Sequence, residues 1–185
     1  MVSLTTAPGF AGAAFFLFYA LLGVPLLWKG EALPELAGAS LLLAAALAAL
    51  SAIDLARYQL PDVLTLPLTG LGLLVSWWIG TMPLWWSAVS AAAGFLLLAL
   101  VGRLYLYIRG RTGLGLGDAK LLAASGAWLG AEAIPTVLLW ATGAALVYVL
   151  VAAFRDSSLS GATRIPFGPF LCFGTWLVWL YGAMH

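Results

Sequence analysis

The sequence is poor in the residues that carry most metal and nucleophile chemistry. Among its 185 residues there is one histidine, His185, and one cysteine, Cys172. A single cysteine cannot form an internal disulfide, and the chain offers no Cys/His ligand set for a zinc site. A Ser-His-Asp triad is close to excluded, because His185 would have to supply its base. We therefore expect no metal and no organic cofactor, and we expect Cys172 to pack as a small hydrophobic residue.

Charge is scarce as well. Only 8% of the residues are charged and 64% are hydrophobic, against roughly 25% and 45–50% in soluble domains. So much apolar surface cannot be hidden from water in a chain of this size, so the lipid bilayer must be its solvent. The net charge of +1 gives no indication of a basic surface that would bind nucleic acid. The composition predicts an all-α, polytopic membrane protein that does not bind nucleic acid.

The apolar residues fall into about six to seven runs that we expect to be membrane helices. The first, about 10–28, is interpreted as a retained transmembrane helix, because it is long for a signal peptide and no Lys or Arg precedes it. The later runs are about 36–56, 62–79, 84–108, 118–129 and 133–154, with a last run ending near Tyr181. We predict one membrane-embedded domain over 1–185, in which helix 10–28 is an addition to a core of about 36–185.

The run that starts at Asp118 is shorter than the others. As a helix it covers only about 20 Å, less than the hydrocarbon thickness of about 30 Å. We expect this helix to start below the headgroups or not to cross fully.

Basic residues and tryptophans predict the orientation. If the polar stretch 54–62 faces the cytoplasm, Lys29 alone falls on the opposite side. The basic residues that fall on the cytoplasmic side are Arg57, Arg109, Arg111, Lys120, Arg155 and Arg164. This bias puts the N-terminus inside and the C-terminus outside. Four tryptophans around the turn 80–83 mark a membrane–water interface.

Two polar stretches interrupt the apolar pattern, and the predicted topology brings them to the same membrane face. One runs from Asp54 to Asp62, and the other, residues 113–120, holds three alternating glycines followed by Asp118 and Lys120. Ionisable residues inside a membrane segment are costly and are often functional. We therefore interpret Asp54 and Asp118 as a catalytic pair.

Structural roles compete with this interpretation. Asp54 could pair with Arg57 on its own helix, and Asp118 and Asp62 could be N-caps, which is the favoured role for Asp62. Lys120 could attract a substrate carboxylate or extend its ammonium to water.

The glycines have two possible uses. Glycines at 113, 115 and 117 could supply unusual backbone shapes, or they could allow a second helix to approach closely. The stretch lacks the Gly-Lys-Ser/Thr of a phosphate-binding loop.

Three motifs together resemble the type IV prepilin leader peptidases, membrane aspartic proteases of the GxGD class. They are Ile53-Asp54 with Leu60-Pro61-Asp62 in the first stretch, Gly115-Leu-Gly117-Asp118-Ala-Lys120 in the second, and Ile165-Pro166-Phe167-Gly168-Pro169 near the end. The resemblance runs in order from about residue 36 to the end. It implies that Asp54 and Asp118 are catalytic, and it makes Gly115, Gly117, Lys120, Asp62, Pro166 and Gly168 candidates for supporting the site.

The resemblance also implies a substrate and a place. The substrates are prepilins or pseudopilins, whose short basic leader is cut after a glycine at the cytoplasmic face of the bacterial inner membrane. Long members of the family carry an N-terminal region with Cys-x-x-Cys pairs that is associated with N-methylation. This chain has one cysteine, so we expect a short, peptidase-only form without N-methyltransferase activity.

The expected mechanism uses one ionised and one protonated carboxyl group. Because a helix start favours a negative charge and a helix end disfavours it, we predict Asp118 as the base and Asp54 as the acid, an order that Arg57 could reverse. The alternatives are a small proton-coupled transporter, a structural membrane scaffold, and a GxGD protease that cuts within transmembrane helices. The sequence leaves the oligomeric state open.

Overall fold

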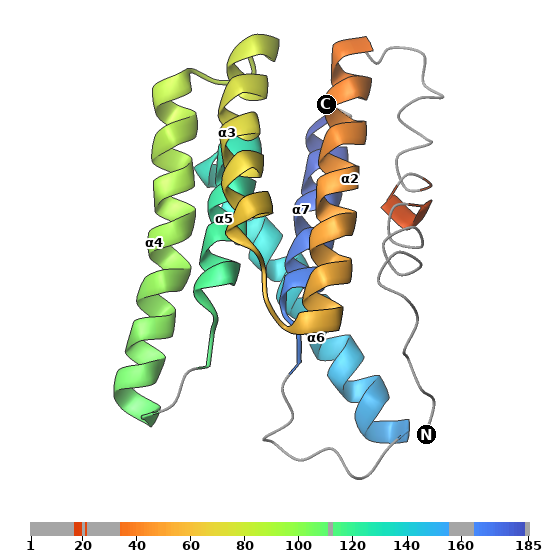
Figure 1. Ribbon diagram of the computed structural model, residues 1–185, viewed down its shortest axis with the longest axis vertical. Helices are drawn as coiled ribbons and strands as arrows, with labels where there is room; N and C mark the ends of the chain where they lie inside the picture. Colours follow the sequence, from red (N-terminus) through yellow and green to blue (C-terminus); the bar gives the residue numbers. More distant parts are fainter. Residues whose placement is uncertain (1–16, 20, 22–33, 111–112, 156–164, 184–185) are drawn as a thin grey trace.

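The computed structural model describes residues 17–19, 21, 34–110, 113–155 and 165–183, and within these ranges every regular element is helical (Figure 1). The elements are α2 (Pro34–Arg57), α3 (Asp62–Ile79), α4 (Leu84–Arg109), α5 (Leu116–Leu129), the 3₁₀ turn η1 (Ala131–Ala133), α6 (Ile134–Arg155) and α7 (Gly168–Ala183). The prediction of an all-α chain is confirmed.

Four of these helices, α2, α3, α4 and α6, are long and apolar enough to cross a membrane, and α7 is a shorter apolar helix. The chain is therefore a multi-pass membrane protein. Most of the predicted helix 10–28 lies outside the described residues. Within it, Leu17–Phe18–Tyr19 is helical, and the buried Tyr19 hydroxyl lies 3.2 Å from the Ser51 hydroxyl of α2.

Helix boundaries follow the turn residues of the sequence. Helix α3 ends at Ile79 because Gly80 takes the left-handed conformation with φ of 75°, and α4 ends at Arg109 because Gly110 does the same with φ of 65°. Pro61 and Pro83 occupy the N-cap positions of α3 and α4. These are the breaks that the apolar runs predict, so the observed ends lie within a few residues of the expected ones.

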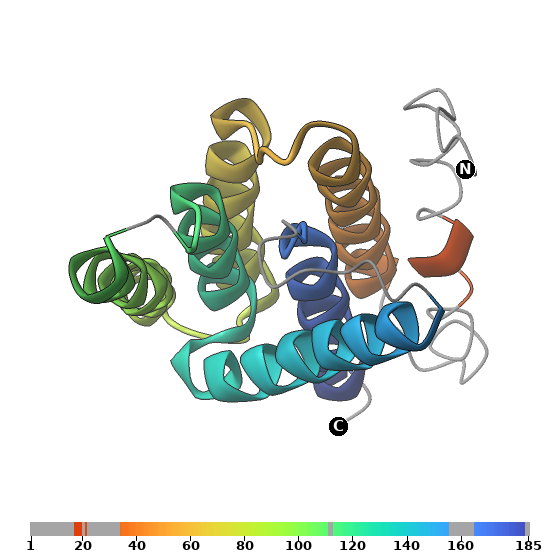
Figure 2. The same ribbon diagram turned by 90° about the horizontal axis from the view of Figure 1, so that it is seen from below.

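Helix α5 is the core of the bundle. It contacts α3, α4, α6 and α7, and nine of its fourteen residues are buried (Figure 2). Helix α4 approaches it closely at Gly94, where a Cβ would stand 2.5 Å from an α5 carbonyl oxygen. Ser76 of α3 and Ser87 of α4 donate hydrogen bonds of 2.9 and 2.6 Å to the carbonyl of Ala127. Close packing and polar contacts thus hold this short helix in place.

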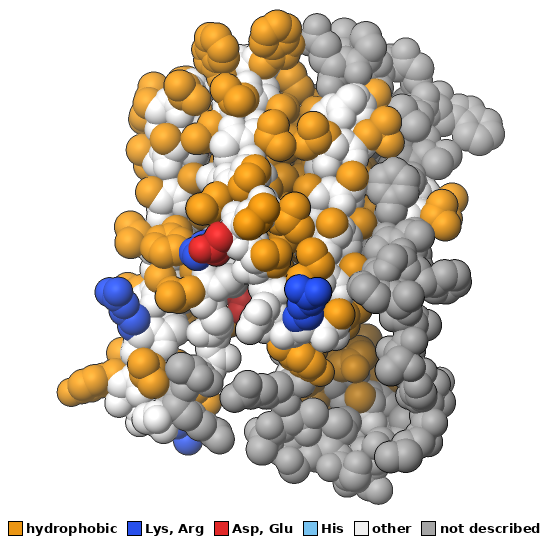
Figure 3. Space-filling model, in the orientation of Figure 1, with side chains coloured by type: hydrophobic (Ala, Val, Ile, Leu, Met, Phe, Trp, Pro, Cys, Tyr) orange, Lys and Arg blue, Asp and Glu red, His pale blue; other side chains and the backbone are white. Residues whose placement is uncertain are grey.

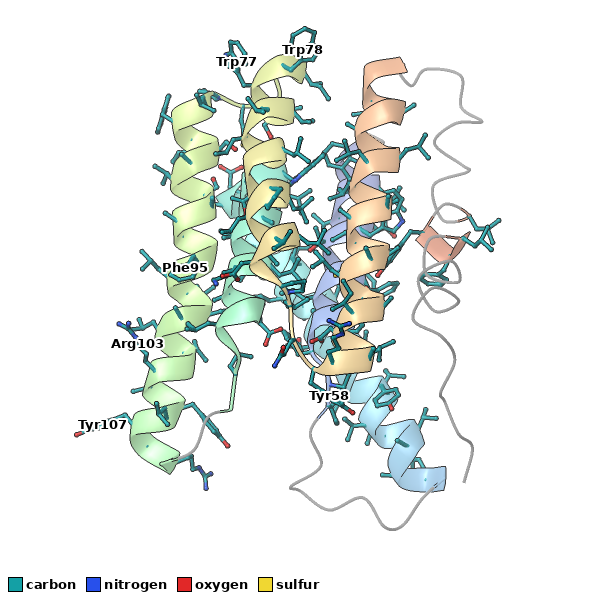
Figure 4. All side chains as sticks on the ribbon, viewed as in Figure 1. Tyr58, Trp77, Trp78, Phe95, Arg103 and Tyr107 are labelled. Carbon is teal, nitrogen blue, oxygen red and sulfur yellow. The ribbon has the colours of Figure 1, made fainter. Side chains whose placement is uncertain are left out.

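The bundle has two chemically different ends. Trp77 and Trp78 project from one end, whereas Tyr58 and Tyr107 lie toward the other (Figure 4). The end of α2 and the start of α5, with Asp54 and Asp118, belong to this second end. We call the two ends the tryptophan end and the aspartate end.

Candidate active site

A cavity of about 380 Å³ opens at the aspartate end, between the end of α2 and the start of α5. Asp54 and Asp118 both line it, together with Gly115 and Gly117. The face shown in Figure 3 is hydrophobic over its upper half, and the charged side chains on it gather lower down. The fold therefore brings the two polar stretches of the sequence together around one cavity.

Asp54 is held from outside its own helix. It lies in the last turn of α2 and is buried, at 5% exposure. Its Oδ2 accepts a 3.0 Å hydrogen bond from the backbone N–H of Gly168, the first residue of α7. A Cβ at position 168 would stand 2.6 Å from that same oxygen. Only glycine therefore lets the α7 backbone approach Asp54 so closely.

Asp118 is held by its own helix start. It is the third residue of α5, and its Oδ2 accepts a 3.3 Å hydrogen bond from the backbone N–H of the N-cap residue Gly115. The suggestion that Asp118 is itself the N-cap is wrong, because the helix begins two residues earlier than predicted. The carboxyl group closes the helix start from the N3 position, as in a capping box.

The two carboxyl groups have similar backbone contacts, since Asp118 accepts one hydrogen bond from the Gly115 N–H and Asp54 accepts one from the Gly168 N–H. These contacts do not distinguish the base from the acid. Which carboxyl group is the base remains a prediction.

Two glycines of the second stretch allow neighbouring side chains to pack directly against the backbone. Gly115 takes φ of −79° and ψ of 147°, which any residue can adopt. A Cβ on Gly113 would meet the ring of Tyr105 at 2.5 Å, and one on Gly117 would meet the Cβ of Leu60 at 3.0 Å. Of the two uses that the sequence left open, the structure favours close packing at both of these positions.

Asp62 and Lys120 form an ion pair. The Lys120 ammonium lies 2.5 Å from Oδ1 of Asp62, and the two side chains are 28% and 56% exposed. Asp62 is the first helical residue of α3 and makes no side-chain capping hydrogen bond, because Pro61 is the N-cap. The prediction that Asp62 caps this helix is therefore wrong. Neither residue is among the described residues that line the cavity.

The remaining candidates are placed differently. Pro166 lies in the segment without regular structure before α7 and is not among the described lining residues. Arg57 lines the cavity, but within the described part of the chain it makes no ion pair with Asp54. Cys172 is fully buried in α7, as expected of a small hydrophobic residue.

Residues between the two aspartates of the first stretch complete the cavity wall. Tyr58 has φ of 53°, the one positive φ among the described non-glycine residues, and its N–H bonds the carbonyl of Asp54 at 2.8 Å. This sharp turn directs the next three residues, Gln59 to Pro61, along the cavity. No role could be assigned to these residues from the sequence, although they lie inside the polar stretch from Asp54 to Asp62. Among the described residues, no group of three His, Cys, Asp or Glu is placed to hold a metal ion.

Comparison with known proteins gives a consistent set of relatives. The model of the type IV leader peptidase family matches residues 41–150. A prepilin leader peptidase/N-methyltransferase of Burkholderia pseudomallei is 47% identical over 132 residues, which cover 71% of this chain and 42% of that protein. Proteins of the same name from Dichelobacter nodosus and Pseudomonas aeruginosa are 42% and 40% identical, covering 74% and 79% of this chain and 46% and 50% of theirs.

The chain thus spans about half the length of the curated relatives that it matches. No solved structure matches it. The family match covers more than half of the chain and includes both aspartates of the cavity. The chain belongs to the type IV leader peptidase family.

Proposed function

We propose that this protein is a membrane aspartic endopeptidase that removes the short basic leader of a type IV prepilin or pseudopilin. Cleavage follows a glycine at the cytoplasmic face of the bacterial inner membrane. The observation that carries the proposal is that Asp54 and Asp118 line one cavity at one end of an apolar bundle. The names of the relatives, prepilin leader peptidase/N-methyltransferase, support the substrate class.

The chemistry requires the two carboxyl groups to differ in protonation. The ionised one takes a proton from water as the water oxygen attacks the scissile carbonyl carbon, and the protonated one donates its proton to the carbonyl oxygen. The first carboxyl group then gives the proton it took from water to the leaving amine as the C–N bond breaks, and the second recovers its proton from a hydroxyl of the collapsing gem-diol. Two carboxyl groups in one cavity share a proton because both cannot readily ionise together.

The Gly168 N–H has a positioning role in this scheme. It fixes the oxygen Oδ2 of Asp54, so the Asp54 carboxyl group has a defined orientation before substrate enters. The segment that supplies this N–H is the last of the three sequence motifs, which is thereby connected to the chemistry through Asp54. Gly168 is accordingly a positioning residue, and Asp54 and Asp118 are the catalytic residues.

The orientation of the protein follows from the same placement. Arg57 and Arg109 are in the last turns of α2 and α4, Lys120 is near the start of α5, and Arg103 lies toward the same aspartate end, which we place at the cytoplasmic face (Figure 4). Helix α7 then runs toward the opposite face, which puts the C-terminus outside. The exposed Trp77 and Trp78 lie at that outer interface (Figure 4).

Mass analysis of the products tests the proposal. The purified protein, in detergent or bilayer discs, is incubated with a prepilin and with a variant whose leader glycine is replaced by valine. The proposal predicts a single cut after the glycine in the first substrate and little or none in the second. A cut within the substrate's transmembrane helix would indicate the other type of GxGD protease. Absence of cleavage of several prepilins, with proton flux in vesicles, would indicate a transporter instead.

A further inference from the structure

A second cavity, of about 430 Å³, lies at the tryptophan end, and nothing above uses it. It is bordered by the turn between α3 and α4, by the end of α5 and by η1. Helix α5 connects the two cavities, since Asp118 borders one and Trp128 borders the other. Fourteen helical residues span about 20 Å, so this second cavity, here called the tryptophan pocket, is far from the catalytic aspartates.

Three tryptophans line the tryptophan pocket, and hydrogen bonds hold two of them. The indole N–H of Trp128 donates to the carbonyl of Leu68, and that of Trp179 donates to the Ser40 hydroxyl, each at 2.9 Å. The Trp128 and Trp179 rings contact each other edge to face with centroids 5.5 Å apart. The third, Trp86, is half-buried beside η1. The aromatic walls are therefore formed by the fold itself, before any ligand binds.

The described residues that line the tryptophan pocket carry charge of one sign. Among the described residues that line it, Glu132 is the charged one, and it is exposed. Trp128 and Trp179 are 2% and 7% exposed, so Trp86 is the lining tryptophan whose ring is more accessible. A carboxylate and an indole in one pocket are a favourable environment for an organic ammonium group, which both attract. The turn between α3 and α4, which borders the pocket, follows the exposed Trp77 and Trp78. Exposed tryptophans of this kind are typical of the depth at which lipid headgroups lie. A volume of 430 Å³ is also within the usual range for small-ligand sites, roughly 300–1,000 Å³.

We propose that the tryptophan pocket binds the ammonium headgroup of a membrane phospholipid, with the ammonium between Glu132 and the indole of Trp86 and with the buried Trp128 and Trp179 beneath it. The acyl chains then extend over the apolar outer surface of the bundle. A lipid with a neutral polyol headgroup carries its negative phosphate without an ammonium, so Glu132 repels it. The pocket therefore selects phosphatidylethanolamine over phosphatidylglycerol.

Native mass spectrometry of lipid retention tests this selectivity. The full-length protein is released from detergent in the presence of equal amounts of phosphatidylethanolamine and phosphatidylglycerol with identical acyl chains. Wild type should retain the ethanolamine lipid preferentially. Replacing Glu132→Gln removes the charge with little change of shape and should reduce that preference about fivefold, and Trp86→Leu should have a similar effect.

The neighbouring Trp85 supplies the matched control. It is 65% exposed, packs against Trp86 with ring centroids 5.4 Å apart and is not among the described residues lining the pocket. Trp85→Leu should leave the preference unchanged. Equal retention of both lipids by wild type would overturn the proposal, as would Glu132→Gln with an unchanged preference or Trp85→Leu with a loss as large as that of Trp86→Leu. The readout involves no prepilin, so it is independent of the proposed peptidase activity.

Discussion

Substituting Gly168→Ala perturbs the candidate site at one atom. The added Cβ would stand 2.6 Å from Oδ2 of Asp54, whereas ordinary contact begins at 3.4 Å, so the carboxyl group or the start of α7 must move by about 0.8 Å. Misplacement of a catalytic group by about 1 Å can cost about 100-fold in rate. We expect kcat for prepilin cleavage to fall by about 10- to 100-fold. KM should change much less, because the Asp54 carboxyl group takes part in the chemical step and is not assigned to substrate binding.

The assay follows leader removal at saturating and limiting prepilin, together with thermal unfolding of the same samples. Gly143→Ala in α6 is the control, because a Cβ there meets nothing within 4 Å. It should cleave at the wild-type rate. The reasoning would be refuted if Gly168→Ala cleaved as fast as Gly143→Ala, or if its rate fell only in proportion to the fraction of unfolded protein.

Two further perturbations address the packing and the ion pair. Gly94→Ala, which places a Cβ 2.5 Å from an α5 carbonyl, should destabilise the bundle by about 1–3 kcal/mol, while Gly70→Ala, with nothing within 4 Å, should not. A double-mutant cycle on the partly exposed pair Lys120 and Asp62 should give at most about 1 kcal/mol of coupling, with cleavage retained.

The order and bounds of the helices could be predicted from the sequence because breakers mark their ends. The run predicted over 62–79 is α3 with the same bounds, since Pro61 precedes it and Gly80 ends it. The central position of α5 could not be predicted in this way. In a membrane protein, lipid-facing and buried residues are equally apolar, so hydrophobicity does not distinguish the core helix from its neighbours.

The candidate site was also predictable only in part: its two aspartates could be found from the sequence, whereas their contact partners could not. Asp54 and Asp118 stand out as carboxylates in apolar surroundings, and the predicted topology puts them at one face. Their partners depend on long-range packing. The Gly168 N–H meets Asp54 across 114 residues of sequence, and Lys120 meets Asp62 across 58. No local pattern encodes either contact. The assignment of Asp62 as a cap was wrong because the helix begins at Asp62 itself, which leaves Pro61 at the N-cap position.

The most direct test of the aspartate pair is cleavage of a prepilin by Asp54→Asn, Asp118→Asn and the double variant, all purified and shown to be folded. Asparagine keeps the size of each side chain and removes its charge and acidic proton. Because the two carboxyl groups act as one unit, each single variant should lose essentially all activity and the double variant should be no worse than either. Near wild-type cleavage by either single variant would contradict the central claim.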